Sequence, residues 1–588
     1  MFALDQYCRG CAATGGFTPW VVPLTLTGGA LLFVAAALLT PDWFGEGRYQ
    51  THAIPLGEQM PAMDTSVSPA ADEPLPSPAG QAAVRNMSAR NMLARISPSA
   101  SQVLLAKLAT NTDVEAVNQF LQRARPYNNV GSSWMLHAGD YNFTLVSLTT
   151  MLYLFGQDPD RLYPETKAHL LAVLLTQDGG TPKEMAPRSG GLVLDTENHH
   201  LMTEGSRYLK NQWLATRGTE TGRADPYYCN VENGLEAWLI AYLETMLCEG
   251  VYEFNSRPYA RLTTHALLNL EAFADGRKVQ LLARHLLDKK NLQYALGSLE
   301  FRRNAPFRRQ YRRAADTGIN REAYSSFVYV WATAPAPEKE IGPPRVHQHS
   351  ALLAALLPYR LPPQVRSWTL DKPEHYFVQF GRGASACPEI YSGGPGYVLS
   401  AGGANRGWRS RIVARPVTLL LSDGVTDISE CFHIPGGGHW RQWNNTGVSR
   451  RFAVANAPVH IPDQYAPVAE QAGWRVFESA AEQSMLIATF SAETLGIIAL
   501  FPDPQKTPES LLAALCEQNA DPAALQTRFV WPDGTTLTYE PEAPKGTWVM
   551  KTDNGETLDR NYDAWPQIKG DLPAFSFERN SESLTGLP

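Results

Sequence analysis

The sequence predicts a multidomain α+β protein with an N-terminal transmembrane helix, a row of helices and a C-terminal antiparallel β-sandwich. Three observations support this: an uncharged apolar run near the start, helical spacing of apolar residues from 101 to about 335, and short β-branched runs after residue 362. The chain has 588 residues, enough for two to four domains at about 150 residues each. Its 44% hydrophobic content excludes a disordered or collagen-like chain.

An uncharged stretch from Ala12 to Pro41 contains the predicted transmembrane helix. Its 19-residue core, Val21 to Leu39, is almost entirely apolar. At about 1.5 Å per residue this core approaches the ~30 Å hydrocarbon thickness of a bilayer. We expect residues 20–40 to form a single inner-membrane anchor, with residues 1–19 cytoplasmic and the large C-terminal body periplasmic or extracellular. A cleavable signal peptide is the alternative, but the run ends in Thr-Pro-Asp and not in a small-residue cleavage site.

A segment rich in proline, serine and alanine follows the anchor, at residues 41–100. Such a composition cannot pack a core and favours an extended chain. We therefore expect a tether that holds the body away from the bilayer.

Residues 101–362 form the predicted helical domain, because apolar residues recur there at helical spacing and short Gly/Pro/Asp turns separate the segments. Helices without intervening strands must pack on one another, as a bundle, a solenoid or an α/α toroid. The expected helical ranges are 101–109, 143–155, 170–175, 201–213, 235–247, 259–273, 279–287 and 324–331.

Residues 363–588 form the predicted antiparallel β-sandwich, because short β-branched runs alternate there with Gly/Asn/Asp clusters. Thr527 to Tyr539 is expected to be a hairpin whose turn is Pro532-Asp533-Gly534. One short helix is expected between residues 503 and 522.

Charge and cysteine content exclude several classes of protein. A net charge of -7 makes general nucleic-acid binding a poor fit. Seven cysteines are too sparse for a disulfide scaffold, and Cys8 and Cys11 form a CxxC without a second pair. Cys387 with Cys431, or Cys229 with Cys248, are possible disulfides that the sequence leaves open. We expect no cofactor, and no metal, because adjacent His199 and His200 diverge on a helix and HExxH spacing is absent.

Three polar clusters precede or open predicted helices. The densest is Asp195–His200, the second contains Asp140, and the third contains Arg257, Tyr259 and Arg261. Polar groups at helix starts are well placed to meet a ligand, although helix capping or hydrogen bonds to loops explain the same residues equally simply. In a ring of helices, the three clusters would converge at one end.

Two further segments are candidate substrate-binding surfaces. Six arginines lie between residues 302 and 313, and their guanidinium groups suit carboxylates and sulfates; a solvated face paired with acidic neighbours is the alternative. Loops rich in Gly, Trp, His and Asn in the β-region suit sugar rings and hydroxyls, unless their glycines serve only turn geometry. The residues singled out are Arg302, Arg303, Arg308, Arg309, His439, Trp440 and Trp443.

The order of anchor, tether, helices and sandwich resembles the heparinase II/III and alginate-lyase type of polysaccharide lyase. Asn198-His199 is similar to the Asn-His motif of those lyases, and Arg257 with Tyr259 is similar to their Arg/Tyr pair. Glu197 stands where those lyases commonly have asparagine, and the Arg/Tyr spacing differs. The resemblance implies an incomplete α/α toroid followed by an antiparallel sandwich. It implies catalytic and substrate-binding roles for a set of residues: Asn198, His199, Tyr259, Arg257 and Tyr208 as catalytic, and Asp140, Glu197, His200 and Arg261 as substrate-binding.

The function implied is cleavage of an acidic polysaccharide by β-elimination. Asn198 and Arg257 or Arg261 would neutralise the uronate carboxylate, His199 or Tyr259 would remove the C5 proton, and Tyr259 or Tyr208 would protonate the leaving oxygen. Two alternatives remain open. One is an inverting glycoside hydrolase using a carboxylate pair such as Glu197 and Asp140. The other is a non-catalytic glycan-binding or envelope polysaccharide assembly protein. The sequence does not determine the oligomeric state.

Overall fold

The structure is a computed structural model with a mixed α+β fold. It describes residues 77–132, 140–187, 194–220, 225–251, 255–304, 318–334, 343–380, 389–402, 417–435, 446–479, 485–503, 505–543, 549–558, 576–579 and 582–585. The anchor expected at 20–40 lies outside these ranges. Within them, no helix has the length and apolar character needed to cross a membrane.

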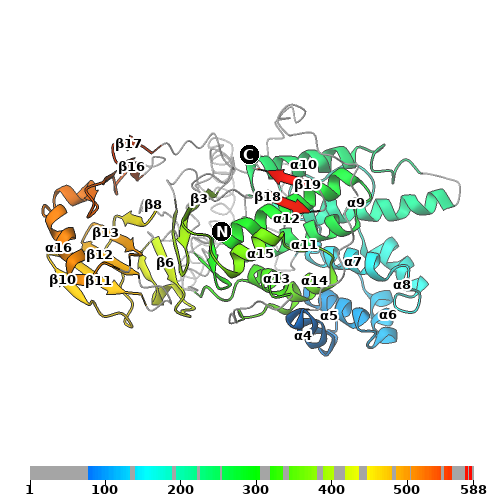
Figure 1. The fold of residues 1–588 in the computed structure, drawn as a ribbon. Helices are drawn as coiled ribbons and strands as arrows, with labels where there is room; N and C mark the ends of the chain where they lie inside the picture. The colour runs from blue at the N-terminus through cyan, green and yellow to red at the C-terminus, as the bar shows by residue number, and fades with distance from the viewer. Residues whose placement is uncertain are drawn as a thin grey trace, which may run out of the picture. The chain divides into compact units, whose positions relative to one another are not determined.

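Helices fill the first part of the described chain and pack on one another around a shared apolar core (Figure 1). The helical ranges expected from the sequence are confirmed, with residues Leu170–Leu174 forming a π-helical turn. The helices are α4 (Pro78–Ser88), α5 (Pro98–Ala109), α6 (Val114–Arg123), α7 (Asn142–Phe155), α8 (Pro164–His169), α9 (Glu197–Glu220), α10 (Leu235–Glu249), α11 (Ala260–Phe273), α12 (Arg277–Leu296), α13 (Ala323–Ala332), α14 (Gln348–Leu356) and α15 (Pro363–Leu370).

Helix α4 corrects the expectation of an extended tether up to residue 100. Ser77 caps this helix by accepting a hydrogen bond from the backbone N–H of Gly80, and Pro78 occupies its first turn. α4 packs on α14 so closely that a Cβ added to Gly80 would lie 2.8 Å from Ala355 Cβ. The Ser-Pro step was interpreted as linker composition, but here it starts a docked helix.

Helices α7 and α9 are parallel neighbours. Near their starts, Asn142 Nδ2 lies 2.8 Å from His199 Nδ1. Toward the end of α7, the Tyr153 hydroxyl donates to the carbonyl of Leu209 at 2.8 Å. Both helices therefore run in the same direction, and their N-termini lie side by side.

Helix α11 is parallel to α7 as well. The Thr150 hydroxyl lies 3.0 Å from His265 Nε2 and donates to Asn269 Oδ1 at 2.8 Å. Further along both helices, the rings of Tyr153 and Phe273 stack with centroids 4.8 Å apart. The N-termini of α7, α9 and α11 consequently lie at one end of this helical group.

Antiparallel sheets follow α15, so helices continue slightly beyond the expected boundary at residue 362. One sheet has the strand order β3-β4-β5-β6-β7 and a second has the order β10-β11-β12-β13-β9-β8. Residues from both, including Leu399 and Ile487, contribute to a single apolar cluster. The strands are β3 (Tyr376–Phe380), β4 (Glu389–Gly394), β5 (Tyr397–Gly402), β6 (Val417–Leu421), β7 (Phe432–Ile434), β8 (Thr446–Ser449), β9 (Phe452–Ala455), β10 (Ala469–Gln471), β11 (Trp474–Glu478), β12 (Leu486–Ala492) and β13 (Leu495–Phe501).

A smaller sheet of β14 (Arg528–Val530), β15 (Thr536–Tyr539), β16 (Met550–Asp553) and β17 (Glu556–Thr557) packs with helix α16 (Pro508–Gln518) on the second sheet. Phe529 pairs with Leu537 across β14 and β15, which confirms the expected hairpin. Gly534 takes a φ of 85°, the left-handed conformation that its turn requires. The expected helix between 503 and 522 is confirmed as α16.

Candidate functional site

The adjacent starts of α7 and α9 bring two of the predicted polar clusters together. His199 is buried, with its Nδ1 at 2.8 Å from Asn142 Nδ2 and its Nε2 at 3.8 Å from Asp140 Oδ2. The ring of Phe143 lies against the imidazole, with centroids 5.5 Å apart. His199 is therefore held on one edge by an amide and faces a carboxylate on the other. The Asp140 side chain is 18% exposed, which gives this edge access to solvent.

The proton position on His199 depends on the Asn142 amide. With the amide nitrogen donating to Nδ1, the proton of a neutral imidazole sits on Nε2 and points toward Asp140. If the amide turns by 180°, its oxygen accepts from Nδ1–H and leaves a lone pair on Nε2. In both states Nδ1 is bonded to the amide, and Nε2 is the nitrogen on the side of Asp140.

Asn198 contributes a polar group that the protein leaves unsatisfied. The Thr196 hydroxyl donates to Asn198 Oδ1 at 2.6 Å, which fixes the orientation of the amide. Asn198 is 0% exposed, and its Nδ2 has no hydrogen-bond partner in the described part of the chain. A buried unpaired donor costs about 1–3 kcal/mol. Such a group in a native fold calls for an explanation, and a bound ligand, an ordered water or a catalytic role each supplies one.

Arg261 lies at the same end of the helical group, on the first turn of α11. Arg261 lies one turn before His265 on α11, and Asn142 lies one turn before Val146 on α7. His265 and Val146 both take part in hydrogen bonds between these two helices. Arg261 and Asn142 therefore lie at the same end of the pair. Arg261 is half-buried, and among the described residues no hydrogen-bond or ion-pair partner engages its guanidinium group. Burial lowers the pKa of Arg261 while the charge of Glu322 raises it, and an arginine remains a cation under such conditions.

Arg257 and Tyr259 precede α11. Tyr259 occupies the N-cap position with φ -110° and ψ -25° and is half-buried. Glu322, which caps α13, is buried; burial raises the pKa of its carboxyl, and the charges of Arg303 and Arg257 oppose this rise. Glu322 is thus an acidic neighbour of both Arg257 and Arg261. Arg261 lies on the first turn of α11 itself and is the arginine considered further for binding an external anion.

On the opposite face of α9, His200 and Tyr208 bind groups of the protein itself, and their predicted roles in the site stay predictions. His200 Nε2 lies 2.8 Å from the carbonyl of Glu184, and burial lowers the His200 pKa, so the ring is neutral and donates there. The Tyr208 hydroxyl donates to Glu236 at 2.8 Å, and burial raises its pKa. Tyr208 also lies about 14 Å from His199 along the helix axis at ~1.5 Å per residue. Glu197, one turn before His200 on this face, is fully buried.

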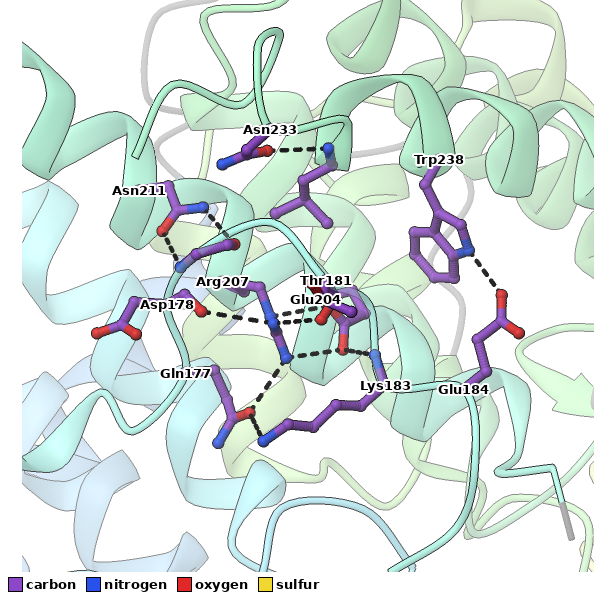
Figure 2. A network of polar contacts seen from close by, with 12 residues as sticks. Gln177, Asp178, Thr181, Lys183, Glu184, Glu204, Arg207, Asn211, Asn233 and Trp238 are labelled. Carbon is purple, nitrogen blue, oxygen red and sulfur yellow. Dashed lines mark hydrogen bonds and ion pairs between the residues drawn. The ribbon is translucent and has the colours of Figure 1, made fainter. Parts of the chain in front are cut away.

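A network of polar contacts joins this face to residues 177–184 (Figure 2). Arg207 pairs with Glu204 at 2.9 Å and donates to the carbonyl of Thr181 at 2.6 Å. Asn211 accepts from the N–H of Gly179 at 3.0 Å and donates to its carbonyl at 2.7 Å. These contacts hold the segment that leads toward α9 and thereby support the helix that carries Asn198.

The expected arginine surface is wrong for Arg302 and Arg303. Arg302 is 5% exposed and donates to the carbonyls of Leu421 and Val425 at 2.6 and 2.8 Å. Arg303 is 2% exposed and lies over the ring of Tyr294 at 5.2 Å. Both guanidinium groups bind the protein itself. Arg302 binds carbonyls more than a hundred residues away in the chain, and Arg303 lies against the rings of Tyr294 and Tyr324. Arg308, Arg309, His439, Trp440 and Trp443 lie outside the described residues.

Asn142 is the site residue that sequence reasoning missed. It belongs to the polar turn that includes Asp140, but its contact with His199 joins residues 57 positions apart. In the described ranges, no group of three or more His, Cys, Asp or Glu side chains is arranged to hold a metal ion. Cys229, Cys431 and Cys516 are free thiols. Comparison with protein-family models gives no match for this chain, and comparison with curated proteins gives none either.

Proposed function

We propose that the chain is a membrane-anchored, exported polysaccharide lyase-like enzyme that cleaves an acidic polysaccharide by β-elimination. Three features at one end of three parallel helices carry the proposal. They are the buried amide donor of Asn198, a histidine beside a carboxylate, and a half-buried arginine, Arg261. Among the described residues, the Asn198 donor has no hydrogen-bond partner, and Arg261 has neither a hydrogen bond nor an ion pair. Two donors and a proton-transfer group are what elimination next to a carboxylate requires.

The reaction begins at the C5 proton of a uronic acid unit. Asn198 Nδ2–H and the Arg261 guanidinium hold the uronate carboxylate and stabilise the negative charge that develops there. In the reactive state the Asn142 amide is turned so that its oxygen accepts from Nδ1–H of His199. His199 Nε2 then takes the C5 proton, and Asp140 stabilises the imidazolium. The electron pair of the broken C5–H bond forms the C4–C5 double bond as the C4–O bond breaks. Tyr259 gives a proton to the departing oxygen.

The proposal includes the arrangement of the helices and sheets and the location of the chain. Helices α5 to α14 would form an incomplete α/α toroid, and the two sheets that share an apolar cluster would form the antiparallel sandwich. Residues 20–40 would anchor the chain in the inner membrane with the body exported, where a polyanionic glycan is accessible.

The hydrolase alternative is weaker because Asp140 and Glu197 lie on opposite sides of the start of α9. Asp140, which precedes α7, lies beside His199, whereas Glu197 shares the helix face of His200, which binds the carbonyl of Glu184. A non-catalytic glycan-binding protein remains an outcome of the test.

The test incubates the full chain with alginate, heparan-type, chondroitin-type and polygalacturonate polymers and follows ultraviolet absorbance from the unsaturated product. We expect absorbance to rise with one of these polymers. The rate of this rise should be about 10²–10⁴-fold lower in His199→Ala, the usual effect of removing a general base. His460→Ala, an exposed histidine in the β-region, is the matched control and keeps full activity. If the wild type binds one of these polymers but does not cleave it, the chain is a glycan-binding protein and not an enzyme.

A further inference from the structure

The β-region contains a cavity that the proposed helix-start site does not use. Its volume is about 850 Å³, within the ~300–1,000 Å³ usual for small-molecule sites. It is lined by residues between 375 and 558, from β3, the β8–β9 turn, the end of β13, the β14–β15 turn and β16–β17. None of the α7, α9 or α11 residues described above takes part.

Trp531 supplies an aromatic surface in this cavity. Its ring packs edge-on against Phe501 and Phe529, with centroids 5.4 and 5.1 Å away and interplanar angles of 71° and 80°. The side chain is only half-buried, so part of the indole faces the cavity. Lys506 Nζ lies 5.6 Å from the Phe501 ring beside it. An indole of this kind stacks on the apolar face of a sugar ring.

Two arginines enter the cavity from a strained turn. Ser449 pairs with Phe452, so Arg450 and Arg451 alone connect β8 to β9. Arg450 has a φ of 49°, a region that favours glycine and costs a larger side chain about 1 kcal/mol or more. Both arginines line the cavity, and Arg451 hydrogen-bonds the side chain of Tyr397 in the same lining.

Hydroxyl-binding groups complete the lining. His375 Nδ1 lies 3.2 Å from the Tyr397 hydroxyl; burial and the Arg451 charge lower the pKa of His375 and keep the ring neutral. The Asp533 carboxylate accepts from the N–H and hydroxyl of Thr535 at 2.9 and 2.7 Å. These bonds lower the pKa of Asp533, so the carboxylate stays ionised as a hydrogen-bond acceptor.

We propose that this cavity is a second, non-catalytic binding site for an acidic oligosaccharide, with Trp531 stacking on a sugar ring and Arg450 and Arg451 binding its carboxylates. The choice of ligand class rests on the proposed function, because an enzyme acting on a long polymer gains residence time from a second attachment point. The lining also contains four carboxylates, which can accept hydrogen bonds from sugar hydroxyls: Asp503, Asp533, Asp553 and Glu556. With the aromatic ring and the two arginines, these groups match a polyhydroxylated, carboxylated ring better than an apolar ligand.

The experiment measures binding of tetrasaccharides of galacturonate, mannuronate and glucuronate-containing repeats to the full chain by titration calorimetry. It uses an Arg261→Gln background, in which the helix-start site has lost its carboxylate partner. We expect one of these tetrasaccharides still to bind, Trp531→Ala to weaken binding about tenfold, and Trp531→Phe to restore part of the loss. Arg451→Gln should weaken binding as well, whereas Arg528→Gln, an exposed arginine on β14 outside the cavity lining, should leave it unchanged.

Absence of binding to all three tetrasaccharides would overturn the inference, as would affinity within twofold of the Arg261→Gln parent for both Trp531 variants. Equal binding of an uncharged tetrasaccharide would overturn the role of the arginines. The two proposals fail separately. If the wild type performs the elimination but the Trp531 variants bind normally, only the second-site proposal is wrong. If binding depends on Trp531 but no elimination occurs, only the lyase proposal is wrong.

Discussion

Two buried asparagines on α9 make a matched pair for testing the site. Asn198 and Asn211 are both 0% exposed, but their hydrogen bonding differs. Asn211 makes three bonds, to the N–H and carbonyl of Gly179 and to Asn230 Oδ1 at 3.0 Å. Asn198 accepts one bond from Thr196, and its Nδ2 has no hydrogen-bond partner within the described ranges. Leucine has nearly the same shape as asparagine and removes both amide atoms.

The expected changes in the free energy of unfolding follow from these contacts. Asn211→Leu leaves both backbone groups of Gly179 without partners, at about 1–3 kcal/mol each, and should destabilise by about 3 kcal/mol or more. Asn198→Leu removes a donor that was already unsatisfied, so the unpaired-donor cost disappears as the Thr196 bond is lost, and the net change should stay within about 1 kcal/mol of zero. Activity should fall by about 10²–10³-fold in Asn198→Leu, as for loss of an oxyanion-type donor.

The assay is urea unfolding of each full-length variant followed by circular dichroism, with product absorbance measured on the same samples. A stable but inactive Asn198→Leu protein is the expected result. If Asn198→Leu loses as much stability as Asn211→Leu, or keeps its activity, Asn198 is a structural residue and the reasoning fails.

Three further predictions concern pH, the far part of α9 and the docking of α4. Burial lowers the His265 pKa to about 3; the unfolded chain therefore binds more protons below pH 6.5, and stability falls as pH falls toward 3. Between pH 6 and 4, His265→Gln should reduce the slope of the free energy of unfolding against pH by about 1.4 kcal/mol per pH unit, as measured by urea unfolding. An unchanged slope would contradict the low pKa of His265. Tyr208→Phe, which loses the bond to Glu236, should cost about 1–2 kcal/mol and leave turnover per folded molecule intact; a large drop in kcat would return Tyr208 to the site. Gly80→Ala should lower the free energy of unfolding by about 1–3 kcal/mol, because the added methyl group overpacks against Ala355. The thermal midpoint should fall accordingly, and an unaffected midpoint would mean that α4 is not docked.

Local sequence patterns predicted the elements well because amphipathic spacing and turn chemistry act over a few residues. The range 143–155 is helix α7 almost to the residue, and Pro532-Asp533-Gly534 forms the turn of the β14–β15 hairpin. Ser77-Pro78 was misinterpreted because the same residues that compose linkers also start helices.

Long-range contacts explain the errors at the site. The arginine-rich sequence around Arg302 predicts a solvated cation. Its partners are instead the carbonyls of Leu421 and Val425, which come from a distant part of the chain. Asn142 carried no signal of its contact with His199, since only the parallel packing of α7 and α9 creates it. Sequence spacing places His200 on a different face from Asn198, but it does not show that residues 177–184 bind that face.

The central claim is that the group formed by Asn198, His199 and Arg261 performs an elimination. The most direct measurement is the ratio of unsaturated ends, from ultraviolet absorbance, to new reducing ends released by the full chain from the polymer it cleaves. The account predicts a ratio of about one, because each broken C4–O bond leaves one double bond and one reducing end. New reducing ends without double bonds would contradict it and identify a hydrolase.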